Sequence, residues 1–280
     1  MRAGGAAAAA LGIDIVSRDL MPRIASSVVL IAIAVVAAWS GGLVAALVVA
    51  AIAAIVHAEW VGITEGALSD ALVFTTAIVV ALLAYGLEYR AVAFAIAGLA
   101  VAAAAVIGRR TWRPLGVLYA LVLGLCLLVL RDSADYGLAA IAILVAVVAA
   151  TDIGAFVAGR AIGGPKLWPA VSPKKTWAGA IGGLASGIVV GLGAASLLHL
   201  EIAGGLIAVF VILSISSQWG DLFESFVKRR FGAKDSGRLV PGHGGLMDRV
   251  DGLVFAIAVA VLIGIGHSGI GNPAQGLVVW

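Results

Sequence analysis

Charged residues are scarce in this sequence. Asp, Glu, Lys and Arg make up 12% of its 280 residues, whereas 62% are hydrophobic. A soluble domain has about 25% charged and about 45–50% apolar residues. A soluble core could not bury this much apolar surface, but a bilayer solvates the outer faces of helices. The composition excludes an ordinary soluble domain and predicts an all-α, polytopic integral membrane protein.

Cysteine is almost absent as well. The single residue, Cys126, lies inside an apolar run. One cysteine excludes a disulfide within the chain and a cysteine-based zinc cluster. We interpret Cys126 as a small buried hydrophobic residue.

Long apolar runs account for most of the chain. About 20 apolar residues cross the hydrocarbon core as a helix. Nine runs are predicted to be transmembrane helices: 23–39, 41–57, 70–87, 90–107, 114–130, 136–158, 178–199, 202–220 and 252–270. We expect a cytoplasmic tail over 1–22, about five membrane helices over 23–135, and a C-terminal region over 136–280 with about four helices and cytoplasmic loops at 159–177 and 221–251.

Positive charge is distributed unevenly between these runs. With the N-terminus in the cytoplasm, every Lys and Arg except Arg90 and Arg131 falls in an inward-facing segment. Cytoplasmic segments of membrane proteins are enriched in Lys and Arg. The asymmetry therefore supports nine helices and an external C-terminus.

Four glycines in the seventh run recur at a spacing of four: Gly179, Gly183, Gly187 and Gly191. This spacing places them on one helix face. We expect the face to allow another helix to approach closely. A groove for a lipid chain is the alternative.

A first polar stretch follows the sixth run. Asp152 lies near its inner end, where a carboxylate is costly unless it is paired, hydrated or bound to a cation. The segment Ser172–Thr176 (SPKKT) then places two ammonium groups and two hydroxyls just before the seventh run. Because Pro173 suits a first helical turn and Ser172 its cap, we predict an anion site here. Simple membrane anchoring by the lysines is the alternative.

A second polar stretch covers 218–252. Four residues would share one face if the eighth helix continues through them: Asp221, Glu224, Ser225 and Lys228. The glycine-rich segment Lys234–Asp251 follows, and Asp248 and Asp251 are spaced three apart at the start of the ninth run. Oxygen ligands without cysteine favour a hard cation such as Mg²⁺. Carboxylates among many basic residues indicate a site for a nucleotide and an anionic lipid.

The segment Ser225–Asp251 closely resembles the signature of the phosphatidate cytidylyltransferases, also called CDP-diglyceride synthetases. The matching positions are Ser225, Lys228, Arg229, Lys234, Asp235, Pro241, His243, Gly244, Gly245, Asp248, Arg249 and Asp251. The segments around Asp152, Ser172–Thr176 and Gly220–Ser225 also resemble this family. Ala178 departs from it, because relatives often have Glu at this position.

The resemblance implies an enzyme that transfers a cytidylyl group from CTP to phosphatidic acid, giving CDP-diacylglycerol and pyrophosphate. It implies Mg²⁺ held by Asp221, Asp251 and Asp248, and a second cation is left open. The implied catalytic residues are Asp221, Ser225, Lys228, Arg229, His243, Asp248, Arg249 and Asp251. The implied substrate-binding residues are Asp152, Ser172, Lys174, Lys175, Thr176, Lys234, Asp235, Gly244 and Gly245.

The resemblance also implies a multi-pass protein of the plasma or inner membrane, with its active site on the cytoplasmic side. A homodimer is left open, and nucleic acid is not expected as a partner. The alternatives are another lipid phosphate as the acceptor, a relative of the polyprenol kinases, and an ion transporter. Glu59-Trp60 resembles the family faintly, and we expect Trp60 to be an interfacial anchor.

Overall fold

The computed structural model describes residues 28–29, 31–65, 71–107, 112–237 and 244–280. The predicted tail 1–22, residues 23–27 and 30 of the predicted helix 23–39, and His243 lie outside the described residues.

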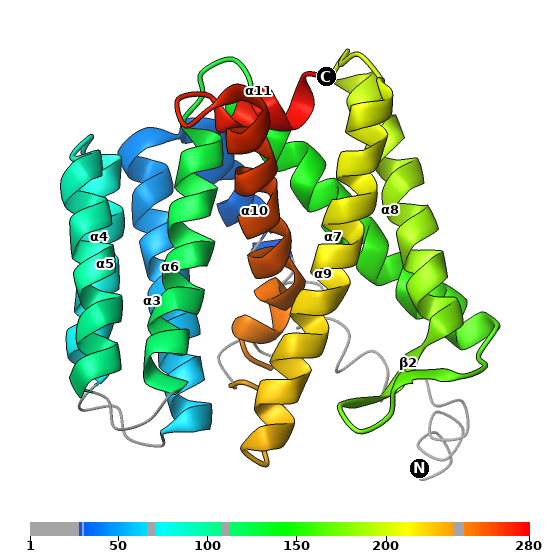
Figure 1. Cartoon of the computed structure of the whole chain (residues 1–280), viewed down its shortest axis with the longest axis horizontal. Coiled ribbons are helices and arrows are strands. Elements are labelled where there is room, and N and C mark those ends of the chain that lie inside the picture. Colours follow the sequence, from blue (N-terminus) through cyan, green and yellow to red (C-terminus); the bar gives the residue numbers. More distant parts are fainter. Residues whose placement is uncertain (1–27, 30, 66–70, 108–111, 238–243) are drawn as a thin grey trace, which may run out of the picture.

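The described elements form an upright helical bundle (Figure 1). In chain order they are a helix at Ile31–Ser40, α3 (Gly42–Thr64), α4 (Ala71–Gly86), α5 (Arg90–Ile107), α6 (Trp112–Arg131), α7 (Gly137–Ala161), β1 (Lys166–Trp168), β2 (Ser172–Thr176), α8 (Trp177–Leu197), α9 (Gly204–Arg230), α10 (Met247–Ser268) and α11 (Pro273–Val278). Helices α3 to α6 stand on one side, α7 to α9 on the other, and α10 between them. A cluster of buried side chains from α3, α6, α9 and α10 joins the two sides.

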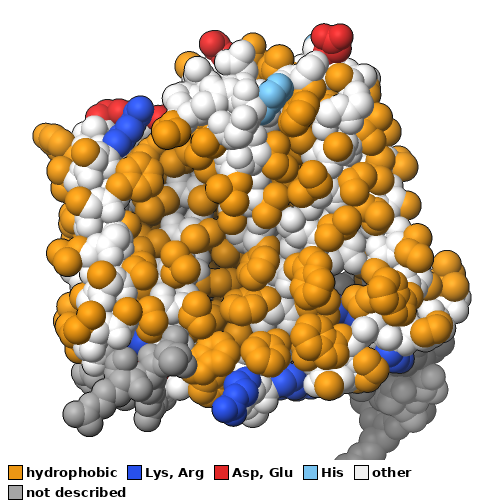
Figure 2. Space-filling view, in the orientation of Figure 1, with side chains coloured by type: hydrophobic (Ala, Val, Ile, Leu, Met, Phe, Trp, Pro, Cys, Tyr) orange, Lys and Arg blue, Asp and Glu red, His pale blue; other side chains and the backbone are white. Residues whose placement is uncertain are grey.

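Seven of the described helices are long and apolar enough to cross a membrane, and the helices Ile31–Ser40 and Ala71–Gly86 are apolar but shorter. Large apolar side chains cover the outward faces of the bundle (Figure 2). This surface suits lipid rather than water as its solvent. The prediction of a helical, polytopic membrane protein is therefore confirmed, whereas the count of nine spans stays a prediction.

Helices α7 and α8 are in close contact along the predicted glycine face. All four glycines of this face are buried. A Cβ on Gly183 would lie 2.7 Å from the carbonyl oxygen of Thr151 in α7, and one on Gly191 would lie 2.8 Å from the Phe210 ring in α9. Only a hydrogen atom at these positions allows the backbones to approach this closely. The packing interpretation of the glycine spacing is confirmed.

A small antiparallel hairpin, β1–β2, connects α7 to α8, with Lys166 opposite Thr176 and Trp168 opposite Ser172. The prediction that Ser172 caps a helix containing Pro173 is therefore wrong. Helix α8 begins at Trp177, and the Thr176 hydroxyl is its cap, accepting a hydrogen bond from the amide of Gly179 at 3.1 Å. Pairing with β1 gives backbone groups of the Ser172–Thr176 segment hydrogen-bond partners in an extended conformation. This explains why the segment is a strand and not the first turn of a helix.

The two ends of the bundle differ in charge. On the face shown in Figure 2, Lys and Arg side chains gather at the hairpin end, and acidic side chains are more prominent at the other end. Arg90 lies at the end opposite the hairpin and contacts Asp132 at 2.8 Å. Arg131, at the same end, donates hydrogen bonds to the carbonyl oxygens of Ala38 and Trp39. The structure thus separates Arg90 and Arg131 from the hairpin end, as the sequence predicts.

The glycine contact between α7 and α8 generates a stability prediction. We expect Gly183→Ala to lower the free energy of unfolding by about 1–3 kcal/mol, because the new methyl group would overlap the Thr151 carbonyl. Gly193, also in α8, faces open space, so Gly193→Ala is the matched control and should be neutral or stabilising by about 0.5–1 kcal/mol. Thermal unfolding in detergent measures both variants, and equal melting temperatures would contradict the prediction.

Candidate active site

A cleft of about 520 Å³ lies at the hairpin end, between α7, the hairpin, α8 and α9. Its charged and polar lining residues are Asp152, Arg160, Lys174, Lys175, Thr176, Gln218 and Asp221, and its apolar lining includes Ala155, Phe156 and Leu167. A site with three cationic side chains, two carboxylates and an apolar wall can accept a ligand that carries both phosphate groups and hydrocarbon.

The hairpin places its lysines in this cleft. Lys174 and Lys175 both line it, and the Lys175 ammonium forms an ion pair with the Asp221 carboxylate. The charges of Asp152 and Asp221 repel one another, and Lys175 and Arg249 offset that repulsion. The structure therefore brings together residues from both polar stretches, separated by about 50 to 100 positions in the sequence.

Helices α9 and α10 cross closely beside this cleft. A Cβ on Gly252 would lie 3.1 Å from the carbonyl oxygen of Ser217, and a Cβ on Gly220 would lie 3.0 Å from the Cα of Gly252. Asp221 follows Gly220 and Asp251 precedes Gly252 in the sequence. The backbones of both aspartates therefore lie at the crossing. Their charges act on one another, and Lys175 offsets part of the repulsion. The crossing therefore brings together the backbones that carry Asp221 and Asp251, whereas a metal ion shared by their carboxylates stays a prediction.

An ionic bridge also joins α9 to α10. The Lys228 ammonium lies 2.6 Å from Glu224 Oε2 and 2.6 Å from Asp248 Oδ1. Glu224 is only 1% exposed, so separating it from Lys228 would leave a buried charge without its cation. Helix α9 runs through Arg230, which confirms the predicted shared face. Lys228 forms ion pairs with two carboxylates, which indicates a structural role in addition to its expected phosphate contact.

Asp248 uses its second oxygen to hold the segment before α10. Its Oδ2 accepts hydrogen bonds from the amides of Ser236 at 3.0 Å and Gly245 at 3.1 Å. Gly244 has a φ of +86°, a left-handed conformation that favours glycine. The geometry favours Asp248 as an anchor of this segment more than as a metal ligand.

Several other expected residues do not line the cleft. Arg229 donates a hydrogen bond to the carbonyl oxygen of Ala233 at 3.3 Å, just beyond the C-terminal end of α9. Lys234 and Asp235 are exposed in the segment after α9, and Ser225 is half-buried on α9. Ser172 is half-buried in β2, where it is not among the cleft-lining residues.

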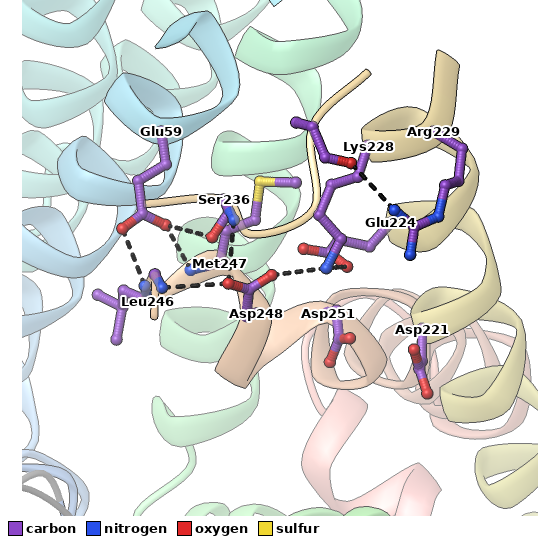
Figure 3. Close-up of polar contacts among 12 residues, drawn as sticks. Glu59, Asp221, Glu224, Lys228, Arg229, Ser236, Leu246, Met247, Asp248 and Asp251 are labelled. Atoms are coloured by element: carbon purple, nitrogen blue, oxygen red, sulfur yellow. Dashed lines mark hydrogen bonds and ion pairs between the residues drawn. The ribbon is translucent and has the colours of Figure 1, made fainter. Parts of the chain in front are cut away.

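Three residues of interest were given no role in the site by the analysis of the sequence. Arg160 and Gln218 line the cleft, and Gln218 donates to the carbonyl oxygen of Ala180 at 3.2 Å. Glu59 in α3 contacts the segment that leads into α10 (Figure 3). A carboxylate within an apolar helix is a signal that could have assigned Glu59 a role, because such a charge needs a partner.

The expectation for Trp60 is wrong. Its side chain is fully buried rather than interfacial, and its indole N–H donates to the carbonyl oxygen of Trp112 at 3.0 Å. Its ring also packs near those of Tyr119 and Phe223. Trp60 therefore fixes α3 against α6 and α9 next to Glu59.

Comparison with known proteins agrees with this arrangement. The model of the Cytidylyltransferase family matches residues 21–265. The phosphatidate cytidylyltransferase of Brucella suis is 54% identical over 155 residues, which are 55% of this chain and 57% of the relative. The protein of the same name from Staphylococcus saprophyticus is 43% identical over 135 residues, 48% of this chain and 52% of the relative. The matched part of the chain thus spans little more than half the length of these relatives.

The family match covers most of the described helices and every element of the cleft. The resemblance seen in the segment Ser225–Asp251 is therefore part of a similarity that extends over most of the chain. The chain belongs to the cytidylyltransferase family.

Proposed function

We propose that this protein transfers the cytidylyl group of CTP to phosphatidic acid and releases pyrophosphate. Family membership and the names of its relatives support this activity. The observation that carries the proposal is the cleft at the hairpin end, where basic and acidic side chains meet an apolar wall. A nucleoside triphosphate and a lipid phosphate both require a site with cationic side chains, and the lipid also requires an apolar wall at one end of a membrane bundle.

The cations of the cleft would bind the substrates and orient them. Lys174, Lys175 and Arg160 can donate charge-assisted hydrogen bonds to phosphate oxygens. An oxygen of the lipid phosphate then forms a bond to the α-phosphorus of CTP, while the bond from that phosphorus to the bridging oxygen breaks and pyrophosphate leaves. The lipid phosphate is already anionic near neutral pH, so the step depends mainly on positioning and charge neutralisation.

We propose Mg²⁺ as the cofactor, held by Asp221 and Asp251. Within the described residues, no three His, Cys, Asp or Glu side chains are grouped to hold a metal ion. Mg²⁺ is usually bound by one or two carboxylates together with substrate phosphates, so a pair of aspartates fits. The ion pair between Lys175 and Asp221 supports this proposal, because a positive charge lies against one of the two carboxylates. When bound, Mg²⁺ would neutralise phosphate charge.

We further propose that the cleft faces the cytoplasm of the cell, at the plasma or inner membrane. Lys and Arg side chains gather at the hairpin end, and this enrichment is typical of cytoplasmic surfaces (Figure 2). CTP is a cytoplasmic nucleotide, so the orientation and the proposed substrate agree. The cleft also lies at one end of the bundle, whereas an ion pathway requires polar groups near the midplane.

The aspartate pair gives a prediction about activity. We expect Asp221→Asn and Asp251→Asn each to lower cytidylyl transfer from radiolabelled CTP to phosphatidic acid by about 100-fold or more, because each removes a negative charge that would hold the Mg²⁺ bound to the phosphates. Asp135→Asn, at an exposed position near the opposite end, is the control and should retain activity. Melting temperatures in detergent should stay close to wild type. Near-normal turnover of either variant at saturating Mg²⁺ would show that other residues bind the metal.

The cleft lysines give a separate prediction about binding. We expect Lys174→Gln to raise the KM for CTP or phosphatidic acid about tenfold, since a charge-assisted hydrogen bond is worth about 1.5–3 kcal/mol. Lys166→Gln is the matched control, because Lys166 is exposed on the same hairpin but does not line the cleft. Steady-state kinetics with each substrate varied separately measures the effect. Equal KM values for the two variants would favour the alternative interpretation, in which Lys174 only anchors the protein at the membrane surface.

The proposed orientation predicts which positions an impermeant maleimide can reach from outside the cell. In a Cys126→Ala background, cysteines replacing Ala134 and Asn272 should react in sealed cells, because both residues are exposed at the end opposite the hairpin. A cysteine replacing Ala170, exposed in the hairpin turn, should react only after the membrane is opened. The reverse labelling pattern would contradict the cytoplasmic placement of the cleft.

A further inference from the structure

Glu59, in α3, makes its contacts with a segment almost two hundred residues later in the chain. Its carboxylate accepts hydrogen bonds from the Ser236 hydroxyl at 3.0 Å, the Leu246 amide at 2.9 Å and the Met247 amide at 2.7 Å. Figure 3 shows these three bonds converging on the one side chain. An N-terminal helix thus holds the segment that begins α10.

The contact serves as a cap for α10. The N-cap residue of this helix is Leu246, whose side chain cannot accept a hydrogen bond from the first amides. Glu59 accepts from two of these amides instead, and a carboxylate at a helix N-terminus is also stabilised by the helix dipole. The cap of α10 is therefore supplied by a different helix, so the position of α10 depends on the position of α3.

Two glycines make room for the Glu59 carboxylate. A Cβ on Gly237 would lie 2.6 Å from Glu59 Oε1, and a Cβ on Gly245 would lie 2.6 Å from Glu59 Oε2. Any larger residue would displace the carboxylate or the backbone around it. This close approach gives a physical reason for glycine at position 245 that does not involve a ligand.

The segment held by Glu59 leads directly into the candidate site. Asp248 binds the amides of Ser236 and Gly245 with one oxygen and Lys228 with the other. Two carboxylates thus hold the start of α10 between α3 on one side and α9 on the other (Figure 3). Asp251 follows one helical turn after Met247, so a shift or rotation of the first turn of α10 would move Asp251 relative to Asp221.

We propose that Glu59 is a positioning residue for the transfer reaction: by capping α10 from α3, it fixes the first turn of α10 so that Asp251 lies opposite Asp221. The inference rests on the proposed function of the cleft. Among the described residues, Glu59 forms its hydrogen bonds with the Ser236 hydroxyl and with the amides of Leu246 and Met247 at the start of α10. It therefore controls how well the aspartates are arranged, and substrate contacts made by the hairpin lysines are independent of it.

The test compares Glu59→Gln with Glu65→Gln. Glutamine at position 59 keeps the size but replaces one acceptor oxygen with an NH₂ group facing N–H or O–H donors. Glu65, the C-cap residue of α3, is paired with Arg113 at 2.5 Å and its side chain is 5% exposed, so Glu65→Gln disturbs the bundle without touching α10. We expect Glu59→Gln to lower kcat about tenfold or more and to raise the Mg²⁺ concentration needed for half-maximal activity, while the KM for CTP changes little. Glu65→Gln should lower the melting temperature yet keep kcat.

Hydrogen–deuterium exchange provides a readout that needs no substrate. In Glu59→Gln, the amides of Leu246 and Met247 should exchange faster than in wild type, whereas Glu65→Gln should leave them unchanged. Ser236→Ala removes one of the three bonds, so it should lower kcat in the wild type but have little further effect in Glu59→Gln. Wild-type kcat and wild-type protection of both amides in Glu59→Gln would overturn the proposal, as would equal losses of kcat in the two glutamine variants. Absence of cytidylyl transfer in the wild type, with faster amide exchange in Glu59→Gln, would instead overturn the proposed function alone.

Discussion

The close crossing of α9 and α10 is the constraint on which the candidate site depends. Gly220 and Gly252 allow the two backbones to meet where side chains would keep them apart. Because Asp221 and Asp251 adjoin these glycines, both aspartates lie at the crossing, where their negative charges repel one another. Such a pair is costly in an apolar bundle unless cations stabilise it, and Lys175 of the hairpin supplies one positive charge. The negative charge that Lys175 leaves uncompensated is the physical basis for the metal ion proposed above.

Charge compensation explains the surroundings of this crossing. Lys228 lies between Glu224 and Asp248, and Glu59 lies among three hydrogen-bond donors. In water each of these contacts would contribute little, but in an apolar interior a charge without a partner is strongly destabilising. The contacts therefore act as constraints on geometry as well as sources of stability. They tie α3, α9 and α10 together at the end of the bundle where the cleft opens.

The other wall of the cleft has a different physical basis. Helices α7 and α8 have few polar contacts along their shared face and are held by the close approach that the glycines of α8 allow. Such packing is the main source of helix association in lipid, where the hydrophobic effect between helices is weak. The hairpin between these two helices is positioned by their packing, and the hairpin in turn places Lys174 and Lys175 in the cleft.

The sequence by itself determined the membrane class, the approximate positions of most helices, the glycine face of α8 and the return of α10 close to the end of α9. These features depend on hydropathy and periodicity, which are properties of a local stretch of sequence, or on the short connection between two helices. Only the tertiary structure decided that Ser172–Thr176 is a strand, that Lys228 lies between two carboxylates, and that Glu59 caps α10. Each of these depends on which segments pack together. A hydrogen bond between residues 188 positions apart has no local signature, because its partner is set by the packing of the whole bundle.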